Sequence, residues 1–116
     1  MSKKVVIYDV TLRDGTQGEG ISFSVLDKIK ISHEIDELGV EYIEGGWPGS
    51  NERDEGFFNQ AKDEKYVNSK IVAFGSTRRA KSSCDEDLNI QALLRSATSA
   101  VTIVGKTWDF HVSEAL

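Results

Sequence analysis

Short apolar runs, rich in β-branched residues, recur along the chain at regular intervals. The four runs occupy residues 5–8, 40–43, 71–74 and 101–104. Runs of this length and composition are typical of strands buried on both faces of a parallel sheet. Consecutive runs begin about 30 to 35 residues apart, an interval that holds one strand, one helix and two loops. The spacing therefore predicts four βα units.

Helix start and stop signals fill the intervals between the runs. Ser24 and Asp27 have the spacing of a capping box, and Gly39 can end the helix that they begin. Asn51 repeats the cap pattern, a third helix is expected to start near Asp85, and residues 111–116 match the first turns of a fourth helix. The apolar positions carried by the first three helices are Val25, Ile29, Ile35 and Leu38, then Phe57, Phe58 and Ala61, then Leu88, Leu93 and Leu94.

Strict alternation of strand and helix predicts an α/β fold with a parallel sheet and right-handed crossovers. Two architectures meet that description: a doubly wound open sheet, and part of a (β/α)8 barrel. A closed barrel needs about 250 residues, whereas this chain has 116. We therefore expect residues 1–116 to form one unit of about four βα repeats, truncated in the fourth helix.

Composition narrows the functional classes. The chain has 14 Lys and Arg against 19 Asp and Glu, a net charge of −5, with 39% hydrophobic residues. This is globular composition, and an acidic chain without basic clusters argues against binding to nucleic acid or to an anionic membrane. The single cysteine, Cys84, allows no intrachain disulfide, and no signal peptide or membrane span is recognisable. A cytoplasmic location is expected.

In both architectures, chemistry lies just beyond the carboxyl ends of the strands. The first apolar run leads into Asp9, then Arg13 and Asp14, and then three glycines within six residues. A carboxylate at such a position can hold a divalent cation, and a guanidinium can neutralise a carboxylate or an enolate oxygen. A flexible polar turn with an Arg-Asp surface pair explains the same residues equally well.

Polar residues also end the later strands. Glu44 interrupts the second run where a barrel strand would direct it inward, and two glycines follow; pairing of Glu44 with Arg13 is a compatible alternative. The third run ends with Ser76 and Thr77 before two arginines, which indicates either an anion contact or a solvated basic turn. Residues 104–107 lack the upstream glycine of a phosphate loop, so a nucleotide site of that type is excluded.

Residues 9–17, Asp-Val-Thr-Leu-Arg-Asp-Gly-Thr-Gln, closely resemble the start of the pyruvate carboxyltransferase-like barrel family. That family includes isopropylmalate, homocitrate and citramalate synthases and hydroxymethylglutaryl-CoA lyase. Residues 18–24, 42–51 and 74–79 resemble the citramalate synthase branch in particular. The resemblance extends from about residue 5 to residue 116.

The resemblance implies the N-terminal half of a (β/α)8 barrel and an acyltransferase that joins acetyl-CoA to a 2-keto acid with thioester hydrolysis, in branched-chain amino-acid biosynthesis. Pyruvate is the favoured keto acid, followed by 2-ketoisovalerate. It makes Asp14 a ligand of a divalent metal of the Mg, Mn or Zn class. The resemblance also implies that Arg13 binds the keto-acid or enolate oxygen and that Arg13 and Glu44 are catalytic. It implies that Gln17 and Thr77 contact the substrate.

The chain also departs from the family pattern. The His-x-His pair that supplies the family's other metal ligands is absent from these 116 residues, as are the later strands. We therefore interpret the chain as a fragment that is inactive alone and that self-associates through its open sheet edges. The alternatives are a free-standing α/β binding domain and a half-barrel completed by a second copy of itself.

Overall fold

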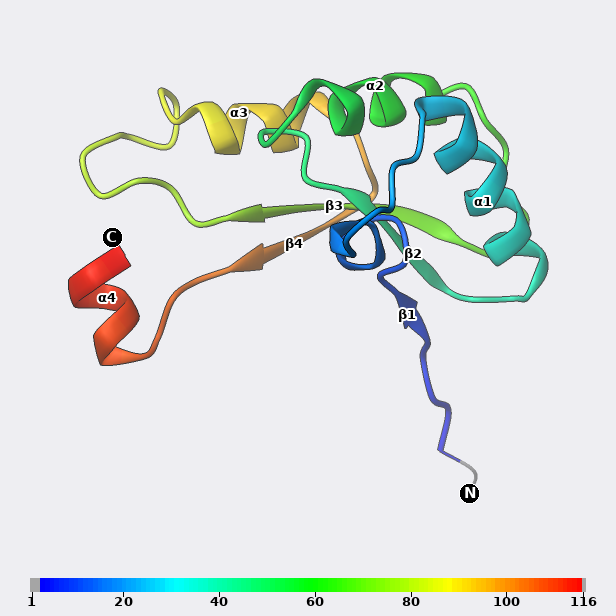
Figure 1. Cartoon of the computed structure of the whole chain (residues 1–116), viewed down its shortest axis with the longest axis horizontal. Helices are drawn as coiled ribbons and strands as arrows, with labels where there is room; N and C mark the ends of the chain where they lie inside the picture. The colour runs from blue at the N-terminus through cyan, green and yellow to red at the C-terminus, as the bar shows by residue number, and fades with distance from the viewer. Residues whose placement is uncertain (1–2, 116) are drawn as a thin grey trace.

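The computed structural model describes residues 3–115, in which strands alternate with helices (Figure 1). In chain order the elements are β1 (Tyr8–Asp9), the 3-10 helix η1 (Asp14–Gln17), α1 (Val25–Glu37), β2 (Tyr42–Gly46), α2 (Glu52–Ala61), β3 (Lys70–Ser76), α3 (Leu88–Arg95), β4 (Ala100–Val104) and α4 (Asp109–Ala115). The alternation predicted from the sequence is confirmed. Within residues 3–115, no helix is long and apolar enough to cross a membrane.

The strands form one parallel sheet in the order β1-β2-β3-β4. Helices α1, α2 and α3 all lie along the same face of this sheet (Figure 1). A doubly wound sheet reverses its strand order and carries helices on both faces, whereas a barrel keeps sequential order with its helices on the outside. The arrangement is therefore that of the N-terminal half of a (β/α)8 barrel. We call the face of the sheet that points away from these helices the inner face.

The sheet is strongly curled toward its inner face. Neighbouring strands lie about 4.8 Å apart, so a flat four-stranded sheet would separate its edge strands by about 14 Å. The Tyr8 hydroxyl on β1 nevertheless lies 2.6 Å from Thr102 Oγ1 on β4, at the opposite edge. A contact between the two edge strands requires the curvature of a barrel wall.

Local capping explains where the first two of these helices begin. The Ser24 hydroxyl accepts the Asp27 backbone N–H at 3.1 Å, and the Asp27 carboxylate accepts the Ser24 N–H at 3.0 Å. This reciprocal pair is the capping box expected from the sequence. The Asn51 side chain accepts the Asp54 N–H at 2.8 Å at the start of α2. Both cap predictions are confirmed.

The third and fourth helices begin at other residues than expected. Helix α3 begins at Leu88, three residues after Asp85, and Asp87 caps it, because the Asp87 carboxylate accepts the backbone N–H groups of Arg79 at 2.8 Å and Ile90 at 3.0 Å. These hydrogen bonds hold the pKa of Asp87 below its ordinary value. Helix α4 begins at Asp109, two residues before the predicted start, and the predicted final residue 116 lies outside the described residues.

The hydrophobic core lies between the sheet and the helices. Its buried members are Leu12, Ile29, Ile35, Ile43, Phe57, Phe58, Ala61, Ala73 and Leu93. Most of the apolar helix positions identified in the sequence belong to this cluster. Leu38, Leu88 and Leu94 are exposed instead. Leu38 is the C-cap of α1 and Leu88 is the first residue of α3, so both lie at helix ends.

The first apolar run is longer than the strand that it forms. Strand β1 covers only Tyr8–Asp9, whereas Val5, Val6 and Ile7 are all more than half exposed. The Ile7 N–H donates to the Glu41 side chain at 2.9 Å instead of joining the ladder. The Ile7 carbonyl still accepts the Tyr42 N–H at 3.2 Å, so the ladder begins one residue before the assigned strand.

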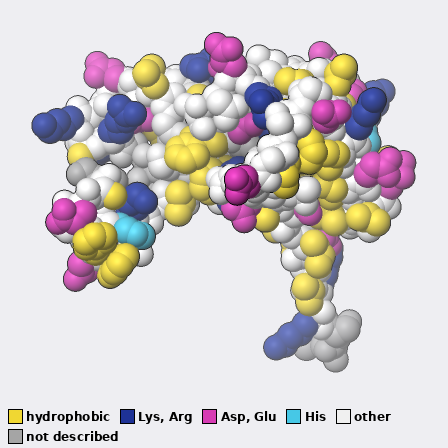
Figure 2. Space-filling view, viewed as in Figure 1, with side chains coloured by type: hydrophobic (Ala, Val, Ile, Leu, Met, Phe, Trp, Pro, Cys, Tyr) yellow, Lys and Arg dark blue, Asp and Glu magenta, His cyan; other side chains and the backbone are white. Residues whose placement is uncertain are grey.

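The C-terminal helix does not cover the last strand. Thr102 points to the inner face, so Val101 and Ile103 point to the face that the other helices cover. Both are about half exposed, because α4 lies away from the sheet (Figure 1). Hydrophobic side chains consequently stand out on the surface of α4 and of the N-terminal segment (Figure 2).

Candidate active site

Arg13 and Glu44 form an ion pair at the carboxyl ends of β1 and β2. The Arg13 Nε–H donates to Glu44 Oε1. The turn that carries Arg13 is fixed by the fully buried side chain of Leu12 and by the Val10 carbonyl, which accepts the N–H of Arg13 at 3.3 Å. The Glu44 side chain is 2% exposed and the Arg13 side chain 21%. The carboxylate is therefore buried while the guanidinium still reaches solvent.

An aromatic platform supports Arg13. Its guanidinium carbon lies 3.9 Å from the centre of the Phe74 ring, a cation–π distance, and the Trp47 ring packs edge-on against Phe74 at 5.3 Å. The Trp47 indole N–H donates to Asn89 Oδ1 at 2.7 Å, and Asn89 Nδ2 donates to the Ser76 carbonyl at 2.5 Å. The end of β3 and helix α3 thus hold the Trp47 indole, which packs against the Phe74 ring behind the arginine.

Tyr8 approaches the same carboxylate from the other side. Its hydroxyl donates to Glu44 Oε2, so both oxygens of Glu44 are hydrogen-bonded. Burial and then the Glu44 carboxylate raise the pKa of Tyr8 to about 12. The phenol is therefore protonated at neutral pH. Glu44 acts here as a doubly held acceptor.

The two glycines after Glu44 make room for helix α2. A Cβ on Gly45 would lie 2.3 Å from a Phe57 ring carbon, and one on Gly46 would lie 2.6 Å from the Asp54 carboxyl carbon. Gly46 also has φ +148°, which disfavours other residues. The register of β2 with β3 shifts between Glu44 and Gly46. These glycines therefore serve close packing and a change of direction at the end of β2.

A pocket of about 600 Å³ opens beside Arg13, between the segment after β1 and the start of α2. It is lined by Arg13, Thr16, Gln17, Phe23, Lys28, Trp47, Ser50, Asn51, Glu52, Arg53 and Asp54. One wall is an ion pair in which Lys28 Nζ donates to Asp54 Oδ1 at 2.7 Å. Lys28 is 1% exposed, and burial lowers its pKa, while its hydrogen bond to the Asp54 carboxylate opposes that shift.

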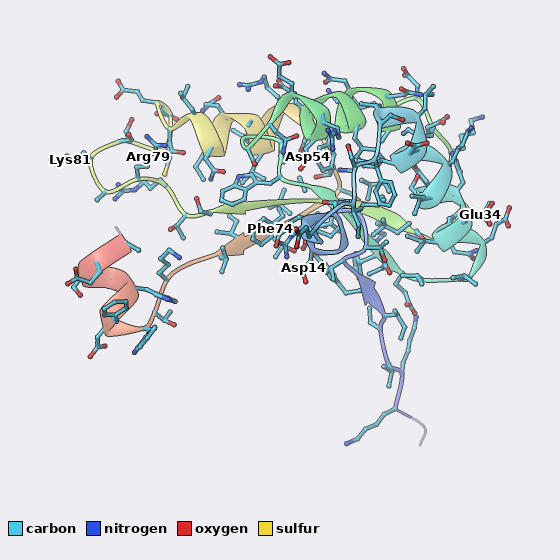
Figure 3. All side chains as sticks on the ribbon, viewed as in Figure 1. Asp14, Glu34, Asp54, Phe74, Arg79 and Lys81 are labelled. Carbon is cyan, nitrogen blue, oxygen red and sulfur yellow. The ribbon has the colours of Figure 1, made fainter. Side chains whose placement is uncertain are left out.

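The other residues predicted for the site, apart from Arg13 and Glu44, do not all lie in this pocket. Gln17 is exposed and lines the same pocket as Arg13. Asp14 is exposed on η1, at the end of β1 (Figure 3). Thr77 follows β3 and donates its backbone N–H to the Val104 carbonyl at 3.2 Å, which places it at the β3–β4 edge and outside the pocket lining.

The side chains that could bind a metal are not grouped in the described part of the chain. Within residues 3–115, no three side chains among His, Cys, Asp and Glu come together to hold an ion. Asp14 offers one exposed carboxylate, and the carboxylate of Glu44 is taken by Arg13 and Tyr8. The described residues therefore do not fit a complete metal site.

Two contributors to this arrangement were missed in the sequence. The sequence marks Tyr8 only as a strand residue, and a phenol at the end of an apolar run is a weak signal for a buried polar contact. Asn89 lies within α3, far along the chain from Trp47, and no local pattern marks it. Both are recognisable only once the sheet has formed and α3 has packed on it.

The comparisons with known proteins agree with this fold. A family model described as HMGL-like matches residues 4–116. The chain is 60% identical over 112 residues, 97% of its length, to the (R)-citramalate synthase of Geobacter sulfurreducens. It is 45% identical to the (R)-citramalate synthase and 33% identical to the 2-isopropylmalate synthase of Sulfolobus acidocaldarius, each over 115 residues, 99% of its length.

The chain spans only part of these relatives, namely 21% of the Geobacter protein and 22% and 28% of the two Sulfolobus proteins. The match nevertheless includes nearly every residue of the chain, from the first strand through the fourth helix. Sequential parallel strands with helices on one face agree with it independently. The chain belongs to the HMGL-like family.

Proposed function

We propose that this chain is the N-terminal barrel half of an acyltransferase that condenses acetyl-CoA with pyruvate to give citramalate. In this reaction the acetyl methyl carbon forms a bond to the keto carbon, the keto oxygen becomes a hydroxyl, and water cleaves the thioester to release CoA. The 2-isopropylmalate reaction, with 2-ketoisovalerate, is the second candidate. Its product differs only in the alkyl group carried by the keto acid.

The observation that carries the choice of pyruvate is a comparison within one organism. Against the two Sulfolobus acidocaldarius enzymes, the same 115 residues are 45% identical to the citramalate synthase and 33% to the 2-isopropylmalate synthase. Divergence between species is the same in both comparisons, so the difference reflects similarity to one enzyme type. The 60% identity with the Geobacter sulfurreducens enzyme points the same way.

The geometry supports a substrate role for Arg13. Only its Nε is engaged by Glu44, and within residues 3–115 neither terminal nitrogen has a hydrogen-bond partner. These nitrogens are the donors that would bind the keto or enolate oxygen, and such fixed donors stabilise developing negative charge. Gln17 in the adjoining pocket and Thr77 at the end of β3 are proposed as further substrate contacts.

Asp14 is proposed as one ligand of a divalent metal of the Mg, Mn or Zn class. Since the described residues supply no set of three ligands, the others must come from outside this chain. We accordingly expect the isolated chain to be inactive. Self-association through the exposed sheet edges and a cytoplasmic location stay predictions.

A chimera tests the function. In the Geobacter chimera, this chain replaces the matching segment of the Geobacter sulfurreducens citramalate synthase. We expect the chimera to release CoA from acetyl-CoA with pyruvate, and more slowly with 2-ketoisovalerate, measured with a thiol reagent. A chimera that folds by circular dichroism but releases no CoA with either keto acid would contradict the proposal and favour a binding domain. Faster turnover of 2-ketoisovalerate would favour the second candidate.

A further inference from the structure

The Tyr8 hydroxyl connects three strands on the inner face of the sheet. It contacts Glu44 on β2 and lies 2.6 Å from Thr102 Oγ1 on β4. The three residues are far apart in sequence, and Thr102 follows Tyr8 by 94 positions. The contact therefore exists only because the sheet is curled, and it meets the site at the carboxylate that holds Arg13.

The direction of each hydrogen bond follows from the chemistry of the groups. An ionised carboxylate only accepts, so Tyr8 donates its proton to Glu44 Oε2 and Arg13 donates from Nε to Oε1. With its proton committed, the Tyr8 oxygen can only accept from Thr102. Thr102 therefore donates to Tyr8 and Tyr8 donates to Glu44, while Arg13 donates to the other oxygen of the same carboxylate.

Both carboxylate oxygens must be held if Arg13 is to be held. A carboxylate with one partner can rotate about its last carbon–carbon bond, and the Arg13 side chain, 21% exposed, would then follow it or separate from it. A donor on the second oxygen removes that rotation. Its effect is greatest where water is excluded, and the Glu44 side chain is only 2% exposed.

We propose that Tyr8 is a positioning residue for Arg13, acting through Glu44, and that Thr102 orients the Tyr8 hydroxyl. The consequence for catalysis rests on the proposed function, in which the terminal nitrogens of Arg13 bind the keto-acid oxygen. The positional effect itself is a property of the chain without substrate. Tyr8 touches no reacting atom in this scheme.

The chain offers a matched control for the hydroxyl. Tyr42 is the register partner of Tyr8 on β2, and the two rings lie 6.2 Å apart. Within the described residues the Tyr42 hydroxyl has no hydrogen-bond partner. Tyr8→Phe and Tyr42→Phe each remove one phenolic oxygen from neighbouring strands, and only the first removes a contact with Glu44.

The test measures hydrogen exchange of the Arg13 Nε–H by ¹⁵N nuclear magnetic resonance in the 116-residue chain without substrate, with the signal assigned by its loss in Arg13→Lys. We expect Tyr8→Phe to accelerate exchange about tenfold, the effect of losing a hydrogen bond to a charged group. Thr102→Val should accelerate it less, Thr102→Ser should restore the rate, and Tyr42→Phe should leave it unchanged.

Equal exchange rates in Tyr8→Phe, Tyr42→Phe and the unmodified chain would overturn the inference. If Tyr8→Phe fails to fold, the contrast between Thr102→Val and Thr102→Ser decides it in the same way. The Geobacter chimera tests the catalytic consequence, where Tyr8→Phe should lower kcat/KM for pyruvate about tenfold. An inactive unmodified chimera contradicts the proposed function alone, because the exchange experiment contains no substrate.

Discussion

Two ion pairs flank the end of β2, one on each face of the sheet. On the inner face, Arg13 pairs with Glu44; on the helix side, Lys28 pairs with Asp54. Both carboxylates are largely buried. The cations differ, since the Lys28 side chain is 1% exposed and the Arg13 side chain 21%. The same kind of interaction therefore occurs in two environments within a few residues of β2.

The difference in exposure separates a pair that stabilises the fold from a pair that can bind a ligand. Asp54 uses both oxygens inside the protein, one for Lys28 and the other for the Trp47 N–H at 2.9 Å, so this pair fastens α1, α2 and the segment after β2 together. Arg13 uses only Nε and keeps donors that reach solvent. The Lys28 ammonium is enclosed by protein, so its pair with Asp54 holds the fold, whereas the partly exposed guanidinium of Arg13 can also bind a ligand.

The largest effect is expected when the Lys28–Asp54 pair loses one member. Asp54→Ala leaves a buried ammonium without its carboxylate and the Trp47 N–H without its acceptor. Removing one partner of a buried ion pair costs about 3 to 5 kcal/mol, so the free energy of unfolding should fall by that amount in urea denaturation at neutral pH. The matched variant Lys28→Met with Asp54→Asn removes both charges and keeps an acceptor for Trp47, and it should recover most of the loss. A change below about 1 kcal/mol in Asp54→Ala would show that this pair is dispensable.

A change in the Arg13–Glu44 pair should affect activity strongly and the free energy of unfolding only slightly. Arg13→Lys keeps a positive charge beside Glu44 but loses the planar fork of donors, so the free energy of unfolding should change by about 1 kcal/mol or less. In the Geobacter chimera, kcat/KM for pyruvate should fall about 100-fold, as expected when a fixed donor to a developing oxyanion is lost. An Arg53→Lys chimera, altered in the same pocket at an exposed position, serves as control. A loss smaller than tenfold for Arg13→Lys would place Arg13 with the structural residues.

Local signals in the sequence were enough to predict the elements. The capping box at Ser24 and the cap at Asn51 are set by residues three positions apart, and the strand interval follows from the spacing of the apolar runs. Arg13 and Glu44 could be paired in advance because both follow neighbouring parallel strands, whose carboxyl ends meet at one edge of the sheet. The choice between barrel and doubly wound sheet needed the strand order, which the alternation does not encode.

The contacts behind the site could not be predicted in this way. Tyr8 meets Thr102 only because the sheet curls, and Trp47 meets Asn89 only after α3 has packed on β3. The glycines after Glu44 illustrate the same limit, because the side chains that they accommodate, Phe57 and Asp54, come from a helix that no local pattern connects with β2. A long-range contact depends on curvature and packing, which no short segment specifies.

Alkaline pH should have a smaller effect on the free energy of unfolding, and the effect differs between Tyr8 on the inner face and Lys28 on the helix side. Unfolded tyrosine ionises near pH 10, whereas folded Tyr8 keeps its proton until its pKa of about 12. Between these values the folded state binds more protons, so the free energy of unfolding should fall as pH rises through this window. Lys28 acts in the opposite direction below its unfolded pKa of 10.5, because burial lowers its folded pKa. Urea denaturation at several alkaline pH values should show a shallower fall in Tyr8→Phe, with Tyr42→Phe unchanged; equal slopes in both variants would remove Tyr8 from the explanation.

A third carboxylate extends the comparison and should give the smallest effect. Asp14 neighbours Arg13 in sequence, but it is exposed, and no cation within the described residues is paired with it. One carboxylate binds a hard cation weakly, so isothermal titration of the isolated chain with Mn²⁺ should give a dissociation constant above about 0.1 mM. Asp14→Asn should abolish this weak binding and leave the thermal midpoint unchanged, because the folded chain makes no use of the charge. Micromolar affinity in the isolated chain would mean that its own residues complete a metal site. Asp14 would then resemble the buried carboxylates, whose partners all lie within this half of the barrel.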